Sequence, residues 1–441
     1  MSNLAELRIA AREIFDEALR EVNAEAAVRR AVRFSDSHFL ICDTPIQAEK
    51  ICAVAIGKAA LSMGHALDQS LGQFLHAGVL AGPAPNLAQI EWLSASRWKW
   101  YVGGHPLPNR DSLAAAADAV GMLQPANRDR SLIVFLISGG GSAMMEWPAT
   151  SSITLSDLQG AHKTLVNCGA SISEINSVRR AFSAIKGGKL AERAANCDQI
   201  TLIISDVPAD GEYNVASGPT LKPDSNAPTA PEVITRYDLR SRLPATVLEA
   251  IDNPREFPAE SVSERKQFVL VSNKDALRGA AAAAEQRGFM VETAKDISDQ
   301  QVADGCVHLL NRLQKIRSQA RSGSNVCLIS GGEFACPVNG DGIGGRNLET
   351  ALRLAMWGAD SRPGDEFVAL CAGTDGIDGN SPASGAIVDS TTIDRARALG
   401  LDPQEFLNRS DAFSFFDALG DAITIGPTGT NVRDLRILLS A

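Results

Sequence analysis

Short apolar runs alternate with longer amphipathic stretches along most of the chain. The runs are rich in β-branched residues and predict strands at 51–56, 131–137, 200–205, 268–272, 326–330, 367–371 and 422–425. The stretches between them carry apolar residues at helical spacing and predict helices at 58–70, 111–123, 176–194, 275–287, 299–319 and 346–357. This alternation is typical of parallel sheets covered by helices, so the expected fold class is α/β.

The length and a local change in composition indicate how the chain is divided. At roughly 150 residues per domain, 441 residues suggest two or three domains. Prolines accumulate between residues 219 and 258, which is typical of a linker or a loose crossover. We therefore expect an N-terminal domain over residues 1–240 and a C-terminal domain over residues 241–441.

The overall composition disfavours several classes of binding partner. The net charge is −10 and the sequence contains no basic stripe, which disfavours nucleic acid and anionic membranes as partners. The longest apolar runs reach about eight residues, whereas a membrane span needs roughly 20. Eight scattered cysteines without a CxxC pair and an acidic, helical N-terminus are typical of a cytoplasmic protein. A small-molecule substrate is the expected partner, and a homo-oligomeric state is left open.

Several predicted strands end in a Gly-rich or acidic turn. In an open parallel sheet, ligands bind beyond the carboxyl ends of the strands, so these turns are the candidate binding elements. In SGGGSA, the glycines allow the backbone to approach an anion, and consecutive amides can form a nest. We expect this turn to bind phosphate or carboxylate through Ser138, Gly139, Gly140, Gly141 and Ser142. The turn Gly331, Gly332 and Glu333 is a second candidate, and a flexible connection is the alternative for both.

Two basic residues stand beside such turns. Lys58 follows Gly57 at the start of a predicted helix, where a cation is unfavourable unless an anion balances it. Arg346 lies between a glycine run and a helix, and its planar fork can bind a carboxylate or phosphate at two points. A solvated surface position is the alternative for each residue.

Acidic residues at strand ends are candidates for metal binding or proton transfer. Asp206 follows the strand at 200–205, and Asp375 and Asp378 lie in GTDGIDG. Such carboxylates can hold Mg²⁺ together with waters and phosphates, or accept a hydroxyl proton. Each can equally be a turn or helix-capping residue.

Two further segments leave alternatives open. His105 lies in the Gly/Pro turn GGHPLPN, where it can contact substrate or shape the turn. The helix predicted at 176–194 carries Arg179, Arg180, Lys186 and Lys189. These cations can form a solvated face or the cationic wall of an anion cleft.

Taken in order, the motifs resemble those of the class II glycerate 2-kinases, a family with a C-terminal MOFRL domain whose members have often been labelled hydroxypyruvate reductases. The resemblance runs through nearly the whole chain. It rests on AIGKAA, GGHPLPN, ISGGGSA, INSVRRAFSAIKGGKLA, ISDVPAD, VASGPT, SGGE, GGRNLE, GTDGIDG and GPTGTNV.

The resemblance implies a kinase, that is, a transferase that uses ATP and Mg²⁺. It would transfer the γ-phosphoryl group to the 2-hydroxyl of D-glycerate, giving 2-phospho-D-glycerate and ADP. It also implies an N-terminal Rossmann-like three-layer domain, a C-terminal α/β domain with the MOFRL region at about 325–435, and an active site in the interdomain cleft.

The resemblance also suggests roles for individual residues. Lys58, Arg346 and Asp206 are the expected catalytic residues. The expected substrate contacts are His105, Asn176, Arg179 and Asp375, and the expected metal ligands are Asp206 and Asp375.

Two other functions remain to be weighed. A nicotinamide-dependent hydroxypyruvate reductase would need a dinucleotide fingerprint followed by an acid about 20 residues on, and the sequence contains neither. A non-catalytic sensor of small sugar acids would not need a lysine, an arginine and several aspartates at strand ends.

Overall fold

The computed structural model describes residues 3–441 except 36–37, 209–210, 255–262, 322 and 359–365. The chain forms two compact units. The inserted unit is Ala24–Leu270, and the flanking unit combines Met1–Asn23 with Val271–Ala441. This division differs from the expected boundary at 240/241, because the described residues between 241 and 270 belong to the inserted unit and the first helix belongs to the flanking unit.

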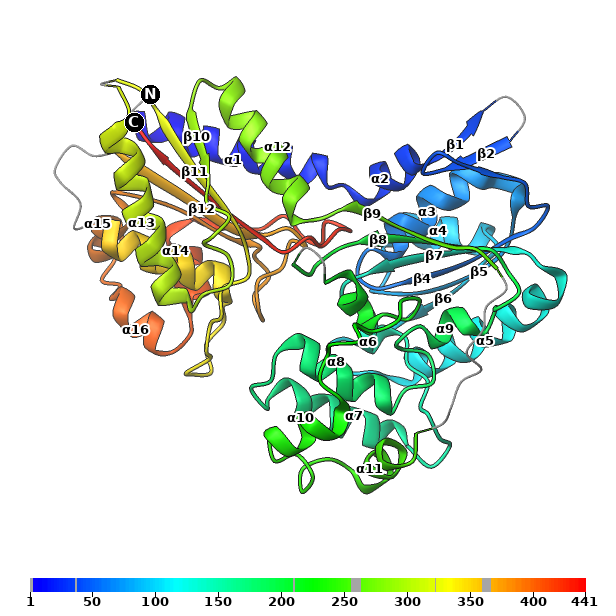
Figure 1. The fold of residues 1–441 in the computed structure, drawn as a ribbon. Helices are drawn as coiled ribbons and strands as arrows, with labels where there is room; N and C mark the ends of the chain where they lie inside the picture. Colours follow the sequence, from blue (N-terminus) through cyan, green and yellow to red (C-terminus); the bar gives the residue numbers. More distant parts are fainter. Residues whose placement is uncertain (1–2, 36–37, 209–210, 255–262, 322, 359–365) are drawn as a thin grey trace. The chain divides into compact units, whose positions relative to one another are not determined.

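The inserted unit is built on a six-stranded sheet with the order β6-β5-β4-β7-β8-β9 (Figure 1). The strands are β4 Ile51–Ile56, β5 Leu75–Gly82, β6 Trp98–Val102, β7 Leu132–Ser138, β8 Gln199–Ile204 and β9 Arg265–Val271. β4 pairs in parallel with β5 and β7, and the pairs β5–β6 and β7–β8 are also parallel. This is the strand order of a Rossmann fold, so the prediction of a Rossmann-like domain is confirmed. The order reverses between β4 and β7, where ligands bind in such sheets.

Helices cover this sheet, which explains why β4 and β7 are continuously apolar. The helices are α2 Ala24–Ala31, α3 Ala60–Leu71, α4 Leu87–Ala95, α5 Arg110–Asp129, α6 Gly141–Met144 and α9 Lys189–Glu192, with 3-10 turns at Gly72–Phe74 and Glu212–Ser217. A small antiparallel sheet of β1 Val32–Ser35, β2 His38–Ile41 and β3 Thr44–Ile46 precedes β4.

A helical cluster completes the inserted unit. It consists of α7 Leu155–Val166, α8 Ile172–Ala181, α10 Ala230–Arg236 and α11 Ala245–Asp252. Its core joins side chains such as Leu158 and Phe182 to Val233 and Val247. The interpretation of 219–258 as a linker is therefore wrong for the described residues up to 254. Two of the prolines, Pro231 and Pro244, stand at helix starts, where the missing N–H costs nothing.

The helix predicted at 176–194 is interrupted. α8 ends at Ala181, and α9 begins only at Lys189. Between them the backbone turns so that Ser183 and Lys186 reach the buried carboxylate of Glu146. The tertiary contact outweighs the local helical pattern.

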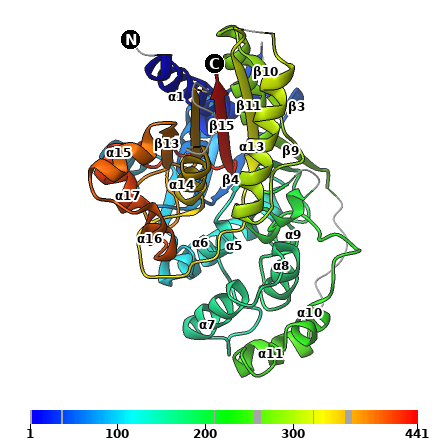
Figure 2. The same ribbon diagram turned by 90° about the vertical axis from the view of Figure 1, so that its left-hand side faces the viewer.

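The flanking unit has a second six-stranded sheet, with the order β10-β11-β15-β12-β13-β14. Its strands are β10 Met290–Thr293, β11 Val326–Gly332, β12 Phe367–Gly373, β13 Gly385–Asp389, β14 Ala422–Ile423 and β15 Asp434–Ser440. Only the β10–β11 pair is parallel, so the expected parallel sheet is wrong for this unit. The cause is two strands that were not predicted. β15 pairs antiparallel with β11 and β12 in the centre of the sheet (Figure 2), and β13 pairs antiparallel with β12 and β14.

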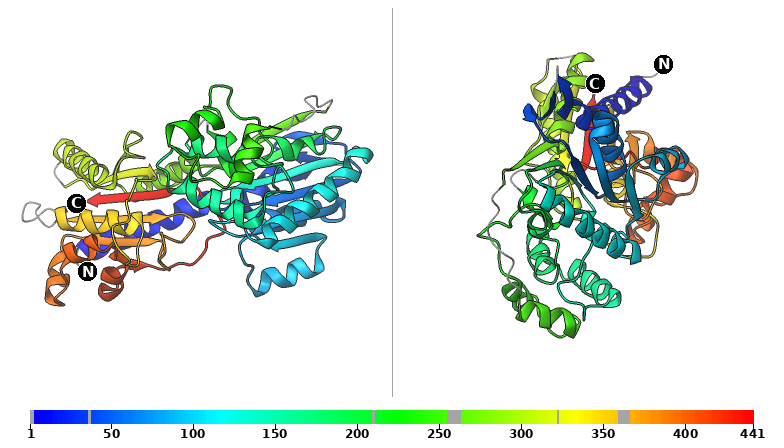
Figure 3. Two further views of the ribbon diagram at one scale, coloured as in Figure 1. Left: turned by 90° about the horizontal axis from the view of Figure 1, so that it is seen from below. Right: turned by 90° about the vertical axis from the view of Figure 1, so that its right-hand side faces the viewer.

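Helices from both ends of the chain pack on this sheet. They are α1 Asn3–Glu21, α12 Asn273–Gln286, α13 Val302–Gln319, α14 Arg346–Gly358, α15 Thr392–Ala398, α16 Pro403–Asn408 and α17 Ala412–Leu419. α1 packs against α12, β12 and β15 (Figure 3). Arg8 fastens α1 to the unit, since its guanidinium donates to Asp389 and Asp421 at 2.6 Å each. Within the described residues no helix is long and apolar enough to cross a membrane.

Candidate active site

The turns after β4 and β7 interlock where the strand order of the inserted unit reverses. The amide of Lys58 donates to the carbonyl of Gly139 at 2.8 Å. The Ser138 hydroxyl accepts from the Ala59 amide at 3.0 Å and donates to the Ile56 carbonyl at 3.2 Å. Ser138 is fully buried, so its hydroxyl joins the two turns.

Two glycines allow this close approach. Gly57 has φ +113°, and a Cβ there would lie 2.4 Å from the Ser138 carbonyl oxygen. Gly140 has φ +80°, and a Cβ there would lie 3.1 Å from Cγ of Lys58 and 3.2 Å from Cδ2 of His105. Three predicted site elements, Lys58, His105 and the SGGGSA turn, therefore meet at Gly140.

A polar chain leads from this turn to α8. The hydroxyls of Ser142 and Ser217 lie 2.6 Å apart. Ser217 donates to Oδ1 of Asn176 at 2.8 Å, and the same oxygen lies 3.4 Å from Nη1 of Arg179. The predicted residues Ser142, Asn176 and Arg179 are thus brought together through Ser217.

Arg180 holds the loop that carries Ser217. Its Nε donates to the Ser217 carbonyl at 3.2 Å, and its Nη2 donates at 2.8 Å to both the Tyr213 carbonyl and Oδ1 of Asn214. Ser217 has φ +62°, a left-handed conformation that these bonds stabilise. The loop was not predicted as part of the site, although its motif VASGPT was visible in the sequence.

A buried charge cluster lies directly after α6. The Glu146 carboxylate pairs with Lys186 and accepts from Ser183 at 2.6 Å, with Nε2 of His162 at 3.4 Å. Burial alone would raise the pKa of Glu146, but Lys186 and His162 outweigh it and hold that pKa at about 2. Burial lowers the pKa of His162 to about 4. The sequence indicated the cations near this segment, and the carboxylate that binds Lys186 was missed.

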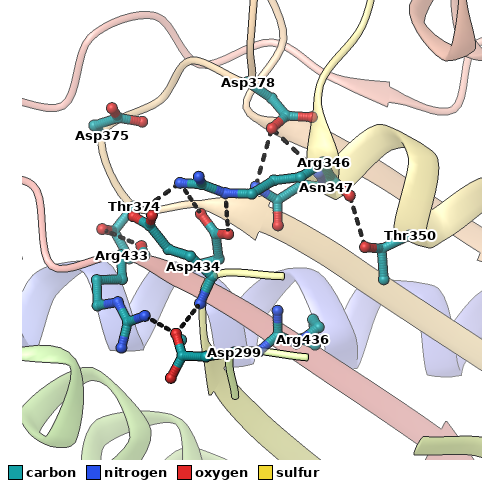
Figure 4. Close-up of polar contacts among 12 residues, drawn as sticks. Asp299, Arg346, Asn347, Thr350, Thr374, Asp375, Asp378, Arg433, Asp434 and Arg436 are labelled. Atoms are coloured by element: carbon teal, nitrogen blue, oxygen red, sulfur yellow. Dashed lines mark hydrogen bonds and ion pairs between the residues drawn. The ribbon is translucent and has the colours of Figure 1, made fainter. Parts of the chain in front are cut away.

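In the flanking unit, Arg346 begins α14 and binds two carboxylates (Figure 4). Its Nε donates to Asp434 at 2.7 Å, and its Nη2 lies 2.8 Å from Glu333. Burial would lower the pKa of Arg346, but Asp434 and Glu333 outweigh this effect and raise it. The predicted residues Arg346 and Glu333 therefore lie together, whereas Asp434, at the start of β15, was missed.

Asp378 caps the start of α14 from the turn after β12 (Figure 4). Its two oxygens accept from the amides of Asn347 at 3.2 Å and Leu348 at 2.8 Å. Burial raises the pKa of Asp378 to about 7, against these amide bonds. Of the two alternatives for this residue, the structure shows the helix-capping role. Asp375 lies in the same turn and accepts from the Ile377 amide at 3.2 Å.

The glycines of the SGGE turn approach neighbouring groups closely. A Cβ at Gly331 would lie 2.0 Å from Oδ1 of Asn273, and Gly332 has φ +83° with its amide bonded to that oxygen at 3.0 Å. Glu333 donates its amide to Asp299, which also pairs with Arg433. Packing against Asn273 thus requires Gly331, and packing against Ser298 together with a positive φ requires Gly332.

The predicted site residues fall into two groups, one in each unit. The inserted unit holds Lys58, His105, Ser138–Ser142, Asn176, Arg179 and Asp206, and the flanking unit holds Gly331–Glu333, Arg346 and Asp375. Among the residues that the structure describes, no three His, Cys, Asp or Glu side chains are grouped to hold a metal ion.

Comparison with known proteins identifies both halves of the chain. Residues 10–252 match a domain of unknown function, DUF4147, and residues 326–434 match the MOFRL family. The chain belongs to the class II glycerate 2-kinase family. A D-glycerate 2-kinase from Thermotoga maritima is 31% identical over 401 residues, which cover 89% of this chain and 91% of the relative.

Other members of the family agree with this assignment. The crystal structure of a glycerate kinase from Thermotoga maritima superimposes with a TM-score of 0.80 at 29% identity, covering 99% of this chain and 100% of that chain. A relative from Agrobacterium vitis, provisionally named a hydroxypyruvate reductase, is 35% identical over 88% of this chain and 98% of its own.

Proposed function

We propose that this chain is a D-glycerate 2-kinase, which transfers the γ-phosphoryl group of ATP to the 2-hydroxyl of D-glycerate and releases 2-phospho-D-glycerate and ADP. The observation that carries the proposal is the meeting of Lys58 with the SGGGSA turn where the strand order of a Rossmann sheet reverses. Relatives named as glycerate kinases, which align with most of the chain, support it.

In the inserted unit, we assign phosphate binding to the turn Gly139–Ser142 and to Lys58. Backbone amides and an ammonium group stabilise the charge on a transferring phosphoryl group without any covalent step. His105, which also lies beside Gly140, is assigned to substrate contact. The hydroxyl of Ser138 keeps the two turns in register.

In the flanking unit, Arg346 is assigned to the negative charge that develops during transfer or to the carboxylate of glycerate. Its guanidinium is held by Asp434 and Glu333, so its orientation is fixed before substrate binds. Gly331, Gly332 and Glu333 are assigned to the nucleotide. An aspartate, Asp206 or Asp375, is assigned to accept the proton of the 2-hydroxyl.

Mg²⁺ would neutralise phosphate charge in such a reaction. Asp206 and Asp375, both half-buried and both following strands, fit an ion that keeps several waters and takes one or two carboxylates. They do not fit an all-protein cage, since the described chain groups no three suitable ligands. We assign any bound Mg²⁺ to Asp206 or to Asp375. The subcellular site of the reaction is proposed to be the cytoplasm.

A product assay tests the proposal. The protein is incubated with D-glycerate, ATP and Mg²⁺, and the product is converted by enolase without a phosphoglycerate mutase. Phosphoenolpyruvate without added mutase is the expected result, because enolase accepts the 2-phosphate only.

A matched pair of variants provides the control. Lys58→Met should lose the phosphoenolpyruvate signal, and Lys50→Met, at an exposed lysine, should keep it. A signal that requires mutase would overturn the 2-position. NADH oxidation with hydroxypyruvate and no phosphorylation would favour the reductase instead.

A further inference from the structure

One asparagine side chain spans the end of a central strand pair in the flanking unit. Asn273 begins α12 and lies beside the last pair of the β11–β15 ladder, Gly332 with Asp434. Its Oδ1 accepts from the Gly332 amide at 3.0 Å, and its Nδ2 donates to the Asp434 carbonyl at 3.0 Å and to the Val432 carbonyl at 2.8 Å. The carboxamide therefore joins the last residue of β11 to the first residue of β15.

The helix that carries Asn273 does not require this side chain. The start of α12 is capped by Ser272, whose amide and hydroxyl donate to Asp275 at 2.8 Å and 2.9 Å. Gly331 leaves the space that the carboxamide occupies, since a Cβ there would lie 2.0 Å from Oδ1 of Asn273. The hydrogen bonds of the Asn273 side chain are therefore directed to the sheet and not to its own helix.

The two carboxylates that hold Arg346 stand at these strand ends. Asp434 accepts from Nε of Arg346 at 2.7 Å (Figure 4). Glu333 directly follows Gly332 and lies 2.8 Å from Nη2 of the same arginine. A guanidinium shared by two carboxylates takes its orientation from both. The orientation of Arg346 therefore depends on how the two strand ends are held together.

We infer that Asn273 is a positioning residue, which fixes the guanidinium of Arg346 through the two carboxylates that hold it. The inference rests on the proposed function and deepens it. An amide is needed at this position, because two carbonyls need N–H donors and the Gly332 amide needs an acceptor. An aspartate would supply the acceptor and would turn an oxygen toward the two carbonyls. A displacement of about 1 Å in a reacting group can cost about 100-fold in rate.

Steady-state kinetics of two variants test this role. For Asn273→Asp we expect kcat/KM for D-glycerate to fall about 100-fold, with the KM for ATP within about threefold of the parent value. Asn273→Ser should lose about tenfold, because water can enter this half-buried position and replace part of the hydrogen bonding. Asn408→Ser, at an exposed asparagine of the same unit, should behave as the parent protein.

A double variant separates positioning from a general effect on the fold. In the background of Arg346→Ala, Asn273→Asp should lower kcat/KM by less than about twofold, because the group that Asn273 positions has been removed. A further loss as large as in the parent background would overturn the inference. A rise in the KM for ATP alone would assign Asn273 to the SGGE turn, and a lower Tm with unchanged kcat/KM would make it structural. Both results would also overturn the inference.

Modification of arginine by phenylglyoxal provides a readout that needs no turnover. The reagent attacks the neutral guanidine, which paired carboxylates disfavour, so Arg346 should react at least about threefold faster in Asn273→Ser than in the parent protein. Mass spectrometry of the peptides measures the rates. Arg312 also pairs with two carboxylates and has a similar exposed fraction, 31% against 36% for Arg346, so its rate should not change.

The modification rates also separate the inference from the proposed function. An unchanged rate at Arg346 would overturn the inference. If the parent protein phosphorylates nothing but Arg346 reacts faster in Asn273→Ser, the positioning role stands and the kinase proposal fails.

Discussion

The two units differ in whether the arginines of the candidate site pair with carboxylates of the chain. In the flanking unit, Arg346 and Arg433 each meet a carboxylate of the chain. In the inserted unit, Arg179 forms no ion pair with a described carboxylate, and Arg180 donates its hydrogen bonds to carbonyl and amide oxygens. An arginine that pairs with a carboxylate of the chain is oriented before a ligand binds, and the ligand then shares the guanidinium with that carboxylate. A buried arginine without such a partner destabilises the free protein, and a bound anion would remove that cost.

The largest expected effect comes from removing the paired arginine. Arg346→Ala should reduce kcat by about 1000-fold or more, roughly 4 kcal/mol, because it removes a charge that the reaction needs in a fixed position. Its side chain is partly exposed, so the fold should remain intact. Steady-state kinetics and a thermal melt measure both quantities. Arg397→Ala, at an exposed pair in the same unit, is the control. A loss below about tenfold would remove Arg346 from the reaction.

A smaller effect should follow from unbalancing the inserted unit further. Glu146→Gln keeps the shape of the side chain and removes the charge that pairs with Lys186. We expect it to lower the free energy of unfolding by about 3 kcal/mol, because Lys186 is left buried without a counter-charge. Urea denaturation measures the change. Glu25→Gln, at an exposed pair with Arg29, should change stability by less than about 1 kcal/mol.

A double variant sharpens this test. Adding Lys186→Met to Glu146→Gln should recover much of the lost stability, since a buried ion pair can often be replaced by neutral groups of similar size. If the double variant were as unstable as the single one, packing and not charge would explain the role of Glu146.

The smallest expected effect is a difference in pH dependence. Asp378 has a pKa of about 7 in the folded protein against an ordinary value of 3.8, so its contribution to stability is lost as the pH rises through about 7. His162 has a pKa of about 4 against 6.5, so its contribution is lost as the pH falls through about 4. As the pH rises from 4 to 6.5, protection of backbone amides against hydrogen exchange should therefore fall in the flanking unit and rise in the inserted unit.

Hydrogen exchange of α14 and α7 peptides, corrected for intrinsic rates, measures these two trends. Asp378→Asn should remove the fall in protection of α14 with rising pH, and His162→Gln should remove the rise in protection of α7. Parallel trends in both units would show that other groups dominate.

Local sequence patterns were sufficient to predict an element when its own residues determine its conformation. The strand at 51–56 agrees with β4 at both ends, because a run of six buried apolar residues has no other stable place in an α/β fold. The strand β15 was not predicted, because Asp434 and Arg436 make its sequence resemble a surface segment. It is buried throughout, and its pairing partners lie about a hundred residues and about 65 residues away in the sequence.

The residues of the candidate site also divide into those that local patterns predict and those that depend on distant partners. Lys58, Gly140 and Arg346 could be found because each stands next to a turn that has a recognisable composition. Asp434 and Glu146 could not, because each acquires its role only through a partner distant in the sequence, Arg346 and Lys186. A single sequence offers no signal for such a pair when one of its two residues lies outside the local motifs.

The connectivity of the flanking unit has a consequence for synthesis on the ribosome. α1 is translated before the inserted unit, yet two strands that it packs against, β12 and β15, are translated after that unit. The inserted unit is continuous and can fold as soon as it has been translated, whereas α1 must wait for the carboxylates that Arg8 binds. During that interval the part of α1 that packs on β12 and β15 has no native partner, so the nascent chain exposes apolar surface that a chaperone can cover.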